Sequence, residues 1–267
     1  MKATIAIQMT CIPEQELLEE RYALEELGIT PIWYGLIPFA DEITNSEEFV
    51  NYDRVVPFGT VKLLKLWMER KLPPQCVIFY DHAKFDQHFY AGAVGPHLLN
   101  YPAKYYKLGD VKDQELDRPV FVKPTHDLKA FGGLVVHSGH TIGQEVYGRM
   151  HDSALTDEEE ILVADVRDDI TREYRNFVVG GELVDSCIYK IGSRVTYEPM
   201  TAEEREQIVA YFKNTKHAYQ PGDTYVVDYA RLENGDFKII EFNDIHCSGM
   251  YCIDRRKLFK AIMERIS

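Results

Sequence analysis

Two pairs of strand-like segments, each joined by a glycine turn, constrain the fold of this chain more than any other feature. The turns are Gly180-Gly181 and Asn234-Gly235, and the segments beside them are residues 173–179 with 182–190, and 225–233 with 236–243. Gly-Gly and Asn-Gly favour two-residue hairpin turns because both central residues need positive φ. The sequence therefore predicts two antiparallel hairpins, and a two-residue turn also predicts which residues face each other.

The second predicted hairpin brings two carboxylates together. Counting back from the Asn-Gly turn places Asp228 opposite Glu241, on one face of the sheet, with Asn243 two residues further along. Like charges in such positions repel, and the apolar residues of the same face would make unpaired carboxylates costly: Ala230, Leu232, Phe237 and Ile239. Magnesium would remove the conflict, because it prefers hard oxygen ligands. A wet sheet edge, a basic partner or a register slip of one residue are the alternatives.

The first predicted hairpin gathers charges of both signs. The Gly-Gly turn places Arg175 opposite Ser186 and Glu173 opposite Ile188, so that Glu173, Arg175 and Lys190 share a face. Two cations near one acid suit a triphosphate or an acyl phosphate, and a plain salt-bridged face is the alternative.

The rest of the chain alternates strands and helices. The first hundred residues predict a parallel α/β layer that ends near residue 102: strands 3–8, 29–34 and 76–80, and helices 13–27 and 61–71. A second section contains strands 119–123 and 134–136 and the apolar segment 161–166. Capping-box spacing at Thr156/Glu159 predicts a turn, and at Thr201/Glu204 a helix. An amphipathic helix follows Asp254.

Composition excludes several classes of protein. The 267 residues carry 43 acidic and 30 basic side chains, a net charge of −13, which disfavours general nucleic-acid binding. Five cysteines without a CxxC pair argue against a disulfide framework and favour a reducing compartment. No signal peptide and no apolar run long enough to span a membrane is present, so we expect a cytoplasmic protein.

Residues 226–251, VVDYARLENGDFKIIEFNDIHCSGMY, resemble the C-terminal metal-binding motif of ATP-grasp enzymes, and in particular a poorly characterised group in phages and bacteria. Glu241-Phe242-Asn243 matches the Glu-x-Asn of that motif, and Asp228 matches its upstream acid. PVFVKP, residues 119–124, resembles the strand whose lysine contacts nucleotide phosphates, here Lys123. THDLKAFGG, 125–133, resembles the flexible lid, and REYRNFVVGGELV, 172–184, the strand that enters a hairpin.

The resemblance implies an α/β (α+β) ATP-grasp fold, in which two subdomains grip ATP and a divalent ion, Mg²⁺ or Mn²⁺. It implies an N-terminal α/β domain (1–102), a small subdomain with the lid (103–166) and a C-terminal subdomain with the metal site (167–267). Asp228, Glu241 and Asn243 would hold the metal. Nucleotide-binding residues would be Lys104 (with Lys107 as its competitor), Lys123, Lys129, Glu173, Val163 and Ala164 at adenine, and Asp165 at ribose. Arg175 and Lys190 would act in catalysis.

The activity that the resemblance implies is a carboxylate–amine ligation. ATP would convert a carboxylate of an amino acid, peptide or protein to an acyl phosphate, which an amine then attacks to give an amide. The alternatives are a kinase that stops at phosphoryl transfer, and a non-catalytic nucleotide-binding module. No Walker A or GxGxxG sequence supports a P-loop or Rossmann site. The expected partners are ATP, a carboxylate and an amine, with a homodimer possible and no membrane; a phage-encoded chain would act in the host cytoplasm.

Overall fold

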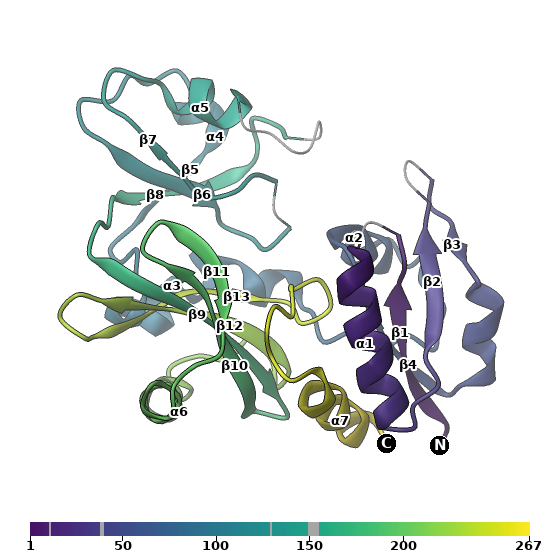
Figure 1. The fold of residues 1–267 in the computed structure, drawn as a ribbon. Coiled ribbons are helices and arrows are strands. Elements are labelled where there is room, and N and C mark those ends of the chain that lie inside the picture. The colour runs from purple at the N-terminus through teal and green to yellow at the C-terminus, as the bar shows by residue number, and fades with distance from the viewer. Residues whose placement is uncertain (11, 38–39, 129, 149–154) are drawn as a thin grey trace.

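The computed structural model describes residues 1–10, 12–37, 40–128, 130–148 and 155–267, and its core consists of three β-sheets. Figure 1 shows the N-terminal sheet on one side, a five-stranded sheet beside it and a four-stranded sheet above the latter. Among the helices of the described residues, none has the length and apolar character needed to span a bilayer.

The N-terminal sheet has the order β3-β2-β1-β4, from strands β1 (Ala3–Gln8), β2 (Ile32–Leu36), β3 (Ile43–Thr44) and β4 (Arg54–Phe58). Strand β1 is parallel to β2 and β4, which confirms the predicted parallel layer. Helix α1 (Glu14–Glu26) ends before Gly28, whose φ of +67° a side chain would disfavour. Helix α2 (Val61–Met68) follows β4. The predicted strand 76–80 is wrong, because only Cys76 forms a bridge, to Val55.

The four-stranded sheet, with order β5-β8-β6-β7, corresponds to the predicted small subdomain. Its strands are β5 (Lys104–Lys107), β6 (Val120–Pro124), β7 (Leu134–Val136) and β8 (Glu160–Asp165). Helices α4 (Leu108–Val111) and α5 (Ile142–Gly148) pack on the face that carries Val120 and Val122. Because side chains alternate along a strand, Phe121 and Lys123 lie on the opposite face. That face is turned toward the five-stranded sheet (Figure 1).

The five-stranded sheet has the order β11-β10-β9-β12-β13. Its strands are β9 (Ile170–Val179), β10 (Glu182–Ile191), β11 (Arg194–Glu198), β12 (Tyr225–Leu232) and β13 (Phe237–Asn243). One face buries aromatic residues such as Tyr174 and Phe242 with helices α3 (Gln87–Val94) and α6 (Ala202–Thr215). The capping box of α6 is confirmed, since Thr201 and Glu204 cap each other's backbone N–H groups.

Two helices pack against segments that are distant from them in the sequence. Helix α3 precedes the predicted boundary at 102 but contributes to the core of the five-stranded sheet. Helix α7 (Arg255–Ile266), the predicted C-terminal helix, packs against α1, β1 and the other face of that sheet (Figure 1). Three 3₁₀ helices complete the described elements: η1 (Ser46–Asn51), η2 (His82–Phe85) and η3 (Gly95–His97). The predicted domain limits thus remain a prediction, and the packing interleaves the segments on both sides of residue 102.

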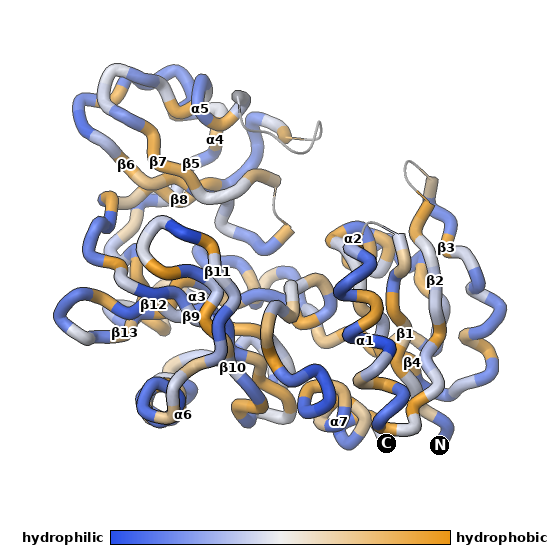
Figure 2. The backbone as a smooth tube through the Cα atoms, in the orientation of Figure 1, coloured by the Kyte–Doolittle hydropathy of each residue, from blue (hydrophilic) through white to orange (hydrophobic). Residues whose placement is uncertain are grey.

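The β12–β13 hairpin pairs Asp228 with Glu241 as predicted, but by a different route. Leu232 is hydrogen-bonded to Asp236, so the turn contains three residues rather than two, with Gly235 at φ +88°. This shifts the register by one, and a bulge at Ile240 shifts it back before Glu241. As a correction, Phe237 and Ile239 face the aromatic core on the opposite side from Ala230. Figure 2 shows the turn as hydrophilic, whereas β1 and β4 are largely hydrophobic.

The β9–β10 hairpin has the predicted two-residue turn, with Gly180 and Gly181 at φ +63° and +76°. Register shifts beyond the turn change the predicted partners further along the strands. Arg175 lies opposite Cys187 rather than Ser186, and Glu173 lies opposite Lys190 rather than Ile188. A bulge inserts one unpaired residue, which a count from the turn does not anticipate.

Candidate active site

A row of side chains crosses four strands of the five-stranded sheet. Register partners place Cys187 beside Arg175, Arg175 beside Asp228, and Asp228 beside Glu241. Directly opposite residues in antiparallel strands point to the same face. Glu241, at one end of the row, lies where this face meets the four-stranded sheet. There the Nζ of Lys123 on β6 lies 2.6 Å from a Glu241 carboxylate oxygen.

Asp228 and Arg175 form a buried ion pair. The Arg175 Nε and Nη2 donate to the two Asp228 oxygens at 3.0 and 2.7 Å, and the side chains are only 7% and 2% exposed for arginine and aspartate. Burial raises the pKa of Asp228, Arg175 opposes that shift, and the charge on Glu241 reinforces it. Asp228 is therefore a carboxylate that needs positive charge nearby to stay ionised.

Asn243 joins the two acids. Its Nδ2 donates to Asp228 at 3.1 Å and to Glu241 at 3.2 Å. The three residues therefore lie together, as the sequence predicted. The alternative of a basic partner also holds, because Arg175 pairs with Asp228 and Lys123 pairs with Glu241. The repulsion between the carboxylates is thus balanced by two cations from different elements.

Glu173 and Lys190 also pair, as neighbours on β9 and β10. The Lys190 Nζ donates to Glu173 at 2.5 Å, and the Tyr189 hydroxyl donates to its other oxygen at 2.6 Å. The predicted shared face of Glu173, Arg175 and Lys190 agrees with the register, because Glu173 pairs with Lys190 and Arg175 lies two residues further along β9. The two cations do not meet at one acid, however: Arg175 pairs with Asp228, and Lys190 pairs with Glu173.

A cleft of about 410 Å³ lies between the four-stranded and five-stranded sheets. Four of the predicted site residues line it: Lys123, Glu173, Lys190 and Glu241. Its wall also includes residues outside the predicted site, among them Asn100, Arg167 and Tyr189. It further includes Val166, the last residue of the predicted apolar segment 161–166, and Arg167 follows it directly, so the end of that segment was the sequence signal for both.

The other predicted nucleotide residues lie elsewhere. Lys104 is opposite Val163, and Val163 is opposite Val122, so these side chains share the face that carries the helices, opposite Lys123. Lys104, Val163, Ala164 and Asp165 line a second cavity, of about 390 Å³. Strand pairing on both sides also engages Val163. Ala164 instead lies opposite Phe121, on the face of Lys123, whereas Asp165 lies opposite Val120 on the helix-covered face. The nucleotide contacts of these four residues remain a prediction. Lys129 lies outside the described residues.

The predicted lid begins with a contact to the loop after Asn243. The carboxylate of Asp127 accepts a 2.6 Å hydrogen bond from the backbone N–H of Asp244. His246 in the same loop accepts from the Phe79 N–H at 2.9 Å through Nε2, and its Nδ1 lies 2.7 Å from the Pro57 carbonyl. Burial lowers the pKa of His246. A neutral imidazole satisfies both contacts, and it fastens the loop to the N-terminal sheet.

The donor set at Asp228, Glu241 and Asn243 fits a hard divalent cation. Two carboxylates and one amide converge, and rotation of the amide would present its oxygen in place of Nδ2. Within the described parts of the chain, no cluster of three or more His, Cys, Asp and Glu side chains is suited to a metal. The candidate centre has only two such residues, so remaining ligands would come from phosphates and water, as magnesium commonly uses.

Comparison with known proteins decides the family. The profile of the ATP-grasp domain, R2K clade family 2, matches residues 104–261, more than half of the chain. This chain belongs to the ATP-grasp family. The match spans both sheets of the cleft and the strands that carry Lys123, Asp228 and Glu241. No curated protein matches the sequence.

Solved structures of a synthetase and of a ligase share the fold along almost all of this chain. D-cycloserine synthetase DcsG is 11% identical with a TM-score of 0.62, and the alignment covers 99% of this chain and 100% of the synthetase. D-alanine–D-alanine ligase from Bacillus anthracis is 12% identical with a TM-score of 0.55, covering 99% and 97%. Its complex with ATP is 14% identical with a TM-score of 0.57 and the same coverage. The predicted ATP-grasp fold is confirmed.

Proposed function

We propose that this ATP-grasp protein joins a carboxylate to an amine through an acyl phosphate. The observation that carries the proposal is the meeting of Lys123 with Glu241 across the cleft, beside Asp228 and Asn243. A cation from one sheet and two acids from the other suit a metal-bound triphosphate held between them. The named activities of the ligase neighbours support the same reaction class.

Different residues of the cleft would bind the phosphates of ATP, its adenine and a metal ion. Lys123 and Lys190 lie on opposite walls and would hold phosphate oxygens of ATP. Lys123, which contacts Glu241 in this structure, would bind a phosphate oxygen instead when ATP is present, and Glu241 would then be available as a metal ligand. The backbone at Val166 and Arg167 would receive adenine, because these residues follow the last strand of the small sheet and line the cleft. A Mg²⁺ ion held by Asp228, Glu241 and Asn243 would supply charge stabilisation at the phosphates.

The chemistry consists of two substitutions. A substrate carboxylate oxygen attacks the γ-phosphorus, and the bond to ADP breaks. The amine nitrogen then attacks the acyl carbon, phosphate leaves, and the nitrogen loses its proton. Arg175 keeps Asp228 ionised and oriented through its two hydrogen bonds. The lid that begins at Asp127 would exclude water, which otherwise hydrolyses the acyl phosphate.

Isotope transfer tests this chemistry directly. ADP release is screened with pairs of amino acids and peptides, and the active pair is repeated with ¹⁸O in the carboxylate. An acyl-phosphate ligase transfers one ¹⁸O to inorganic phosphate and yields an amide. A phosphorylated substrate that accumulates, without amide, would identify a kinase instead. ADP formation without any acceptor dependence would contradict the proposal.

Matched variants locate the site. Lys123→Met and Glu241→Gln should each lower kcat by about 100-fold or more, the usual loss when one preorganised charge contact is removed. Lys104→Met is the control, because its side chain shares the helix-covered face, opposite Lys123, and should keep turnover within about twofold. Full turnover in Glu241→Gln would contradict the metal assignment.

A further inference from the structure

Three tyrosines gather around Arg175 beside the candidate active site: Tyr189 of β10, Tyr197 of β11, and Tyr251, here called the tyrosine cluster. Tyr197 stacks on Tyr251, with ring centres 4.6 Å apart and planes 16° from parallel. The Arg175 guanidinium lies 4.8 Å from the centre of the Tyr251 ring. Tyr189 stacks on Tyr251 at 5.7 Å and also lines the cleft. The cluster therefore joins the cleft to the edge strand of the five-stranded sheet.

Two neighbouring bulges place two of these rings. Strand β10 has one extra residue, Tyr189, opposite the consecutive residues 173–174 of β9. Strand β11 has one extra residue opposite β10, in the stretch 195–198 that contains Tyr197. Both extra residues lie at the same level of the sheet, on adjacent strands. Bulges re-aim side chains and are common next to active sites, so their coincidence here points to a role for the rings.

The third ring also depends on unusual backbone. Tyr251 has a φ of +50°, a conformation that is uncommon for a residue other than glycine. Gly249 has no room for a side chain, because a Cβ there would lie 2.8 Å from the Tyr251 ring. The Gly249 carbonyl also accepts from Arg175 Nη1 at 3.4 Å. Such backbone conformations cluster at binding and catalytic sites, where the surrounding structure holds them.

One face of the Tyr197 ring remains open. Tyr251 covers the other face, and Tyr197 is 54% exposed, whereas the core tyrosines Tyr174 and Tyr225 are 0% and 1% exposed. Packing of the core therefore does not explain the position of Tyr197. A ring of this kind stacks best on another flat ring, as it does on Tyr251. A ligand ring is the partner that the open face fits.

We propose that Tyr197 is a specificity-determining residue that stacks on an aromatic ring of the substrate. The inference rests on the ligase function proposed above and names a substrate class for it: an amino acid or peptide with an aromatic side chain. The ring lies against Tyr197, and the reacting group extends past Tyr251 toward Arg175 and the cleft. The tyrosine cluster makes no bond in the reaction and selects the substrate.

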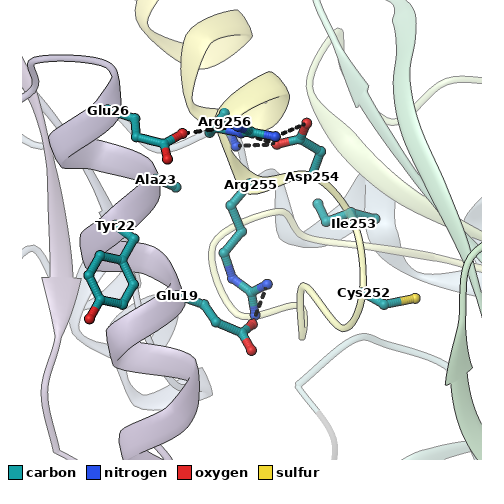
Figure 3. A pocket seen from close by; sticks show the side chains of 9 residues that line it. All are labelled: Glu19, Tyr22, Ala23, Glu26, Cys252, Ile253, Asp254, Arg255 and Arg256. Carbon is teal, nitrogen blue, oxygen red and sulfur yellow. Dashed lines mark hydrogen bonds and ion pairs between the residues drawn. The ribbon is translucent and has the colours of Figure 1, made fainter.

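The surface hollow of about 430 Å³ between α1 and the start of α7 provides a control. Tyr22 lines this hollow and is 60% exposed (Figure 3). The arginines of the hollow pair with acids of α1, Arg255 with Glu19 at 2.7 Å and Arg256 with Glu26 at 2.9 Å (Figure 3). Tyr22→Ala thus removes a tyrosine as exposed as Tyr197 and leaves the tyrosine cluster intact.

Matched amino-acid probes test the inference by binding, without ATP. L-phenylalanine and L-cyclohexylalanine have nearly the same size, but only phenylalanine has a flat aromatic ring. In ligand-observed NMR titrations of the full-length protein, the Kd for phenylalanine should be about 2–12-fold below that for cyclohexylalanine, the gain expected from one aromatic contact. Tyr197→Ala should abolish this preference, whereas Tyr197→Phe and Tyr22→Ala should keep it.

Turnover separates specificity from catalysis. In ADP-release assays with the same probes, Tyr197→Ala should raise the KM for phenylalanine by about 2–12-fold. It should leave kcat within about twofold, because the stacking contact is the same in the ground state and the transition state. The KM for cyclohexylalanine should not change.

The outcomes distinguish the ring site from the ligase function. Equal affinity for the two probes, or a preference that survives in Tyr197→Ala, would overturn the ring site, while amide formation would leave the ligase function standing. Tighter binding of L-lysine than of phenylalanine would also overturn it, because the open face would then hold a cation. A preference that depends on Tyr197, without any amide product, would support the ring site and contradict the ligase function.

Discussion

Replacing Arg175 by methionine removes the cation from a buried pair while keeping most of the side-chain volume. The change leaves the Asp228 side chain, which is 2% exposed, beside the charge of Glu241 and without its two guanidinium hydrogen bonds. An uncompensated buried charge is the costly outcome, more than the loss of the contacts themselves.

The expected loss of stability is about 3–5 kcal/mol, the usual cost of removing one partner from a buried ion pair. For a chain of this size, each kcal/mol corresponds to about 2–4 °C, so the melting temperature should fall by about 6–20 °C. Arg265→Met is the control. Its pair with Asp223 is 46% and 43% exposed for arginine and aspartate, and an exposed pair contributes at most about 1 kcal/mol.

The loss should depend on pH. Arg175 opposes the burial that raises the pKa of Asp228, so its removal raises that pKa further. A carboxyl whose folded pKa exceeds its unfolded value of about 3.9 destabilises the fold increasingly as pH rises from the unfolded pKa to the folded one. Arg175→Met should therefore lose less stability at pH 5 than at pH 8.

Thermal denaturation of four proteins decides the matter: the wild type, Arg175→Met, Asp228→Asn, and the double variant. Removing both charges should restore at least half of the stability lost in Arg175→Met, because the double variant buries no unpaired carboxylate. A loss below 1 kcal/mol (about the ceiling for an exposed pair) in Arg175→Met, or a double variant as unstable as that single one, would refute the reasoning.

Two further predictions concern stability. Burial raises the pKa of Glu20 to about 7, whereas the same side chain in the unfolded chain ionises near pH 4.5. Glu20 therefore does not destabilise the fold below about pH 4.5, and it lowers the stability increasingly as pH rises to about 7. Glu20→Gln should therefore stabilise the protein at pH 8 by on the order of 3 kcal/mol and leave its stability unchanged at pH 4. Glu16→Gln, at an exposed position, should leave the stability unchanged at both pH values. Equal effects of Glu20→Gln at pH 4 and pH 8 would contradict this reasoning. A Cβ on Gly249 would lie 2.8 Å from the Tyr251 ring, so Gly249→Ala should cost about 1–3 kcal/mol by thermal denaturation. Gly92→Ala in α3 meets open space and should stabilise by about 0.5–1 kcal/mol; the opposite order would contradict the packing argument.

Local sequence signals predicted most of the elements. Gly180-Gly181 made the predicted two-residue turn because glycine tolerates the positive φ of both positions. The Thr201 capping box began α6 where the spacing indicated. The family motif, with Asp228 and Glu241, also pointed to the right pair of strands. These features depend on residues a few positions apart, which is why the sequence alone sufficed.

The agreement at Asp228 and Glu241 is instructive because two deviations cancel. A three-residue turn displaced the register by one, and the bulge at Ile240 displaced it back. Counting from the turn gave the right pair but placed Ile239 on the wrong face. The position of a bulge depends on packing on both sides of a sheet, so no local sequence pattern predicted this one.

The sequence by itself determined the parallel layer, the hairpins and the identity of the acids at the candidate centre. Only the tertiary structure decided which cation meets which acid: Arg175 with Asp228, and Lys123 with Glu241 across the cleft. It also decided that Lys104 shares a face with the helices rather than with Lys123. The physical reason is that burial is a property of the whole fold. A charged side chain that is buried away from water needs an oppositely charged partner, and the fold can supply that partner from a distant part of the sequence.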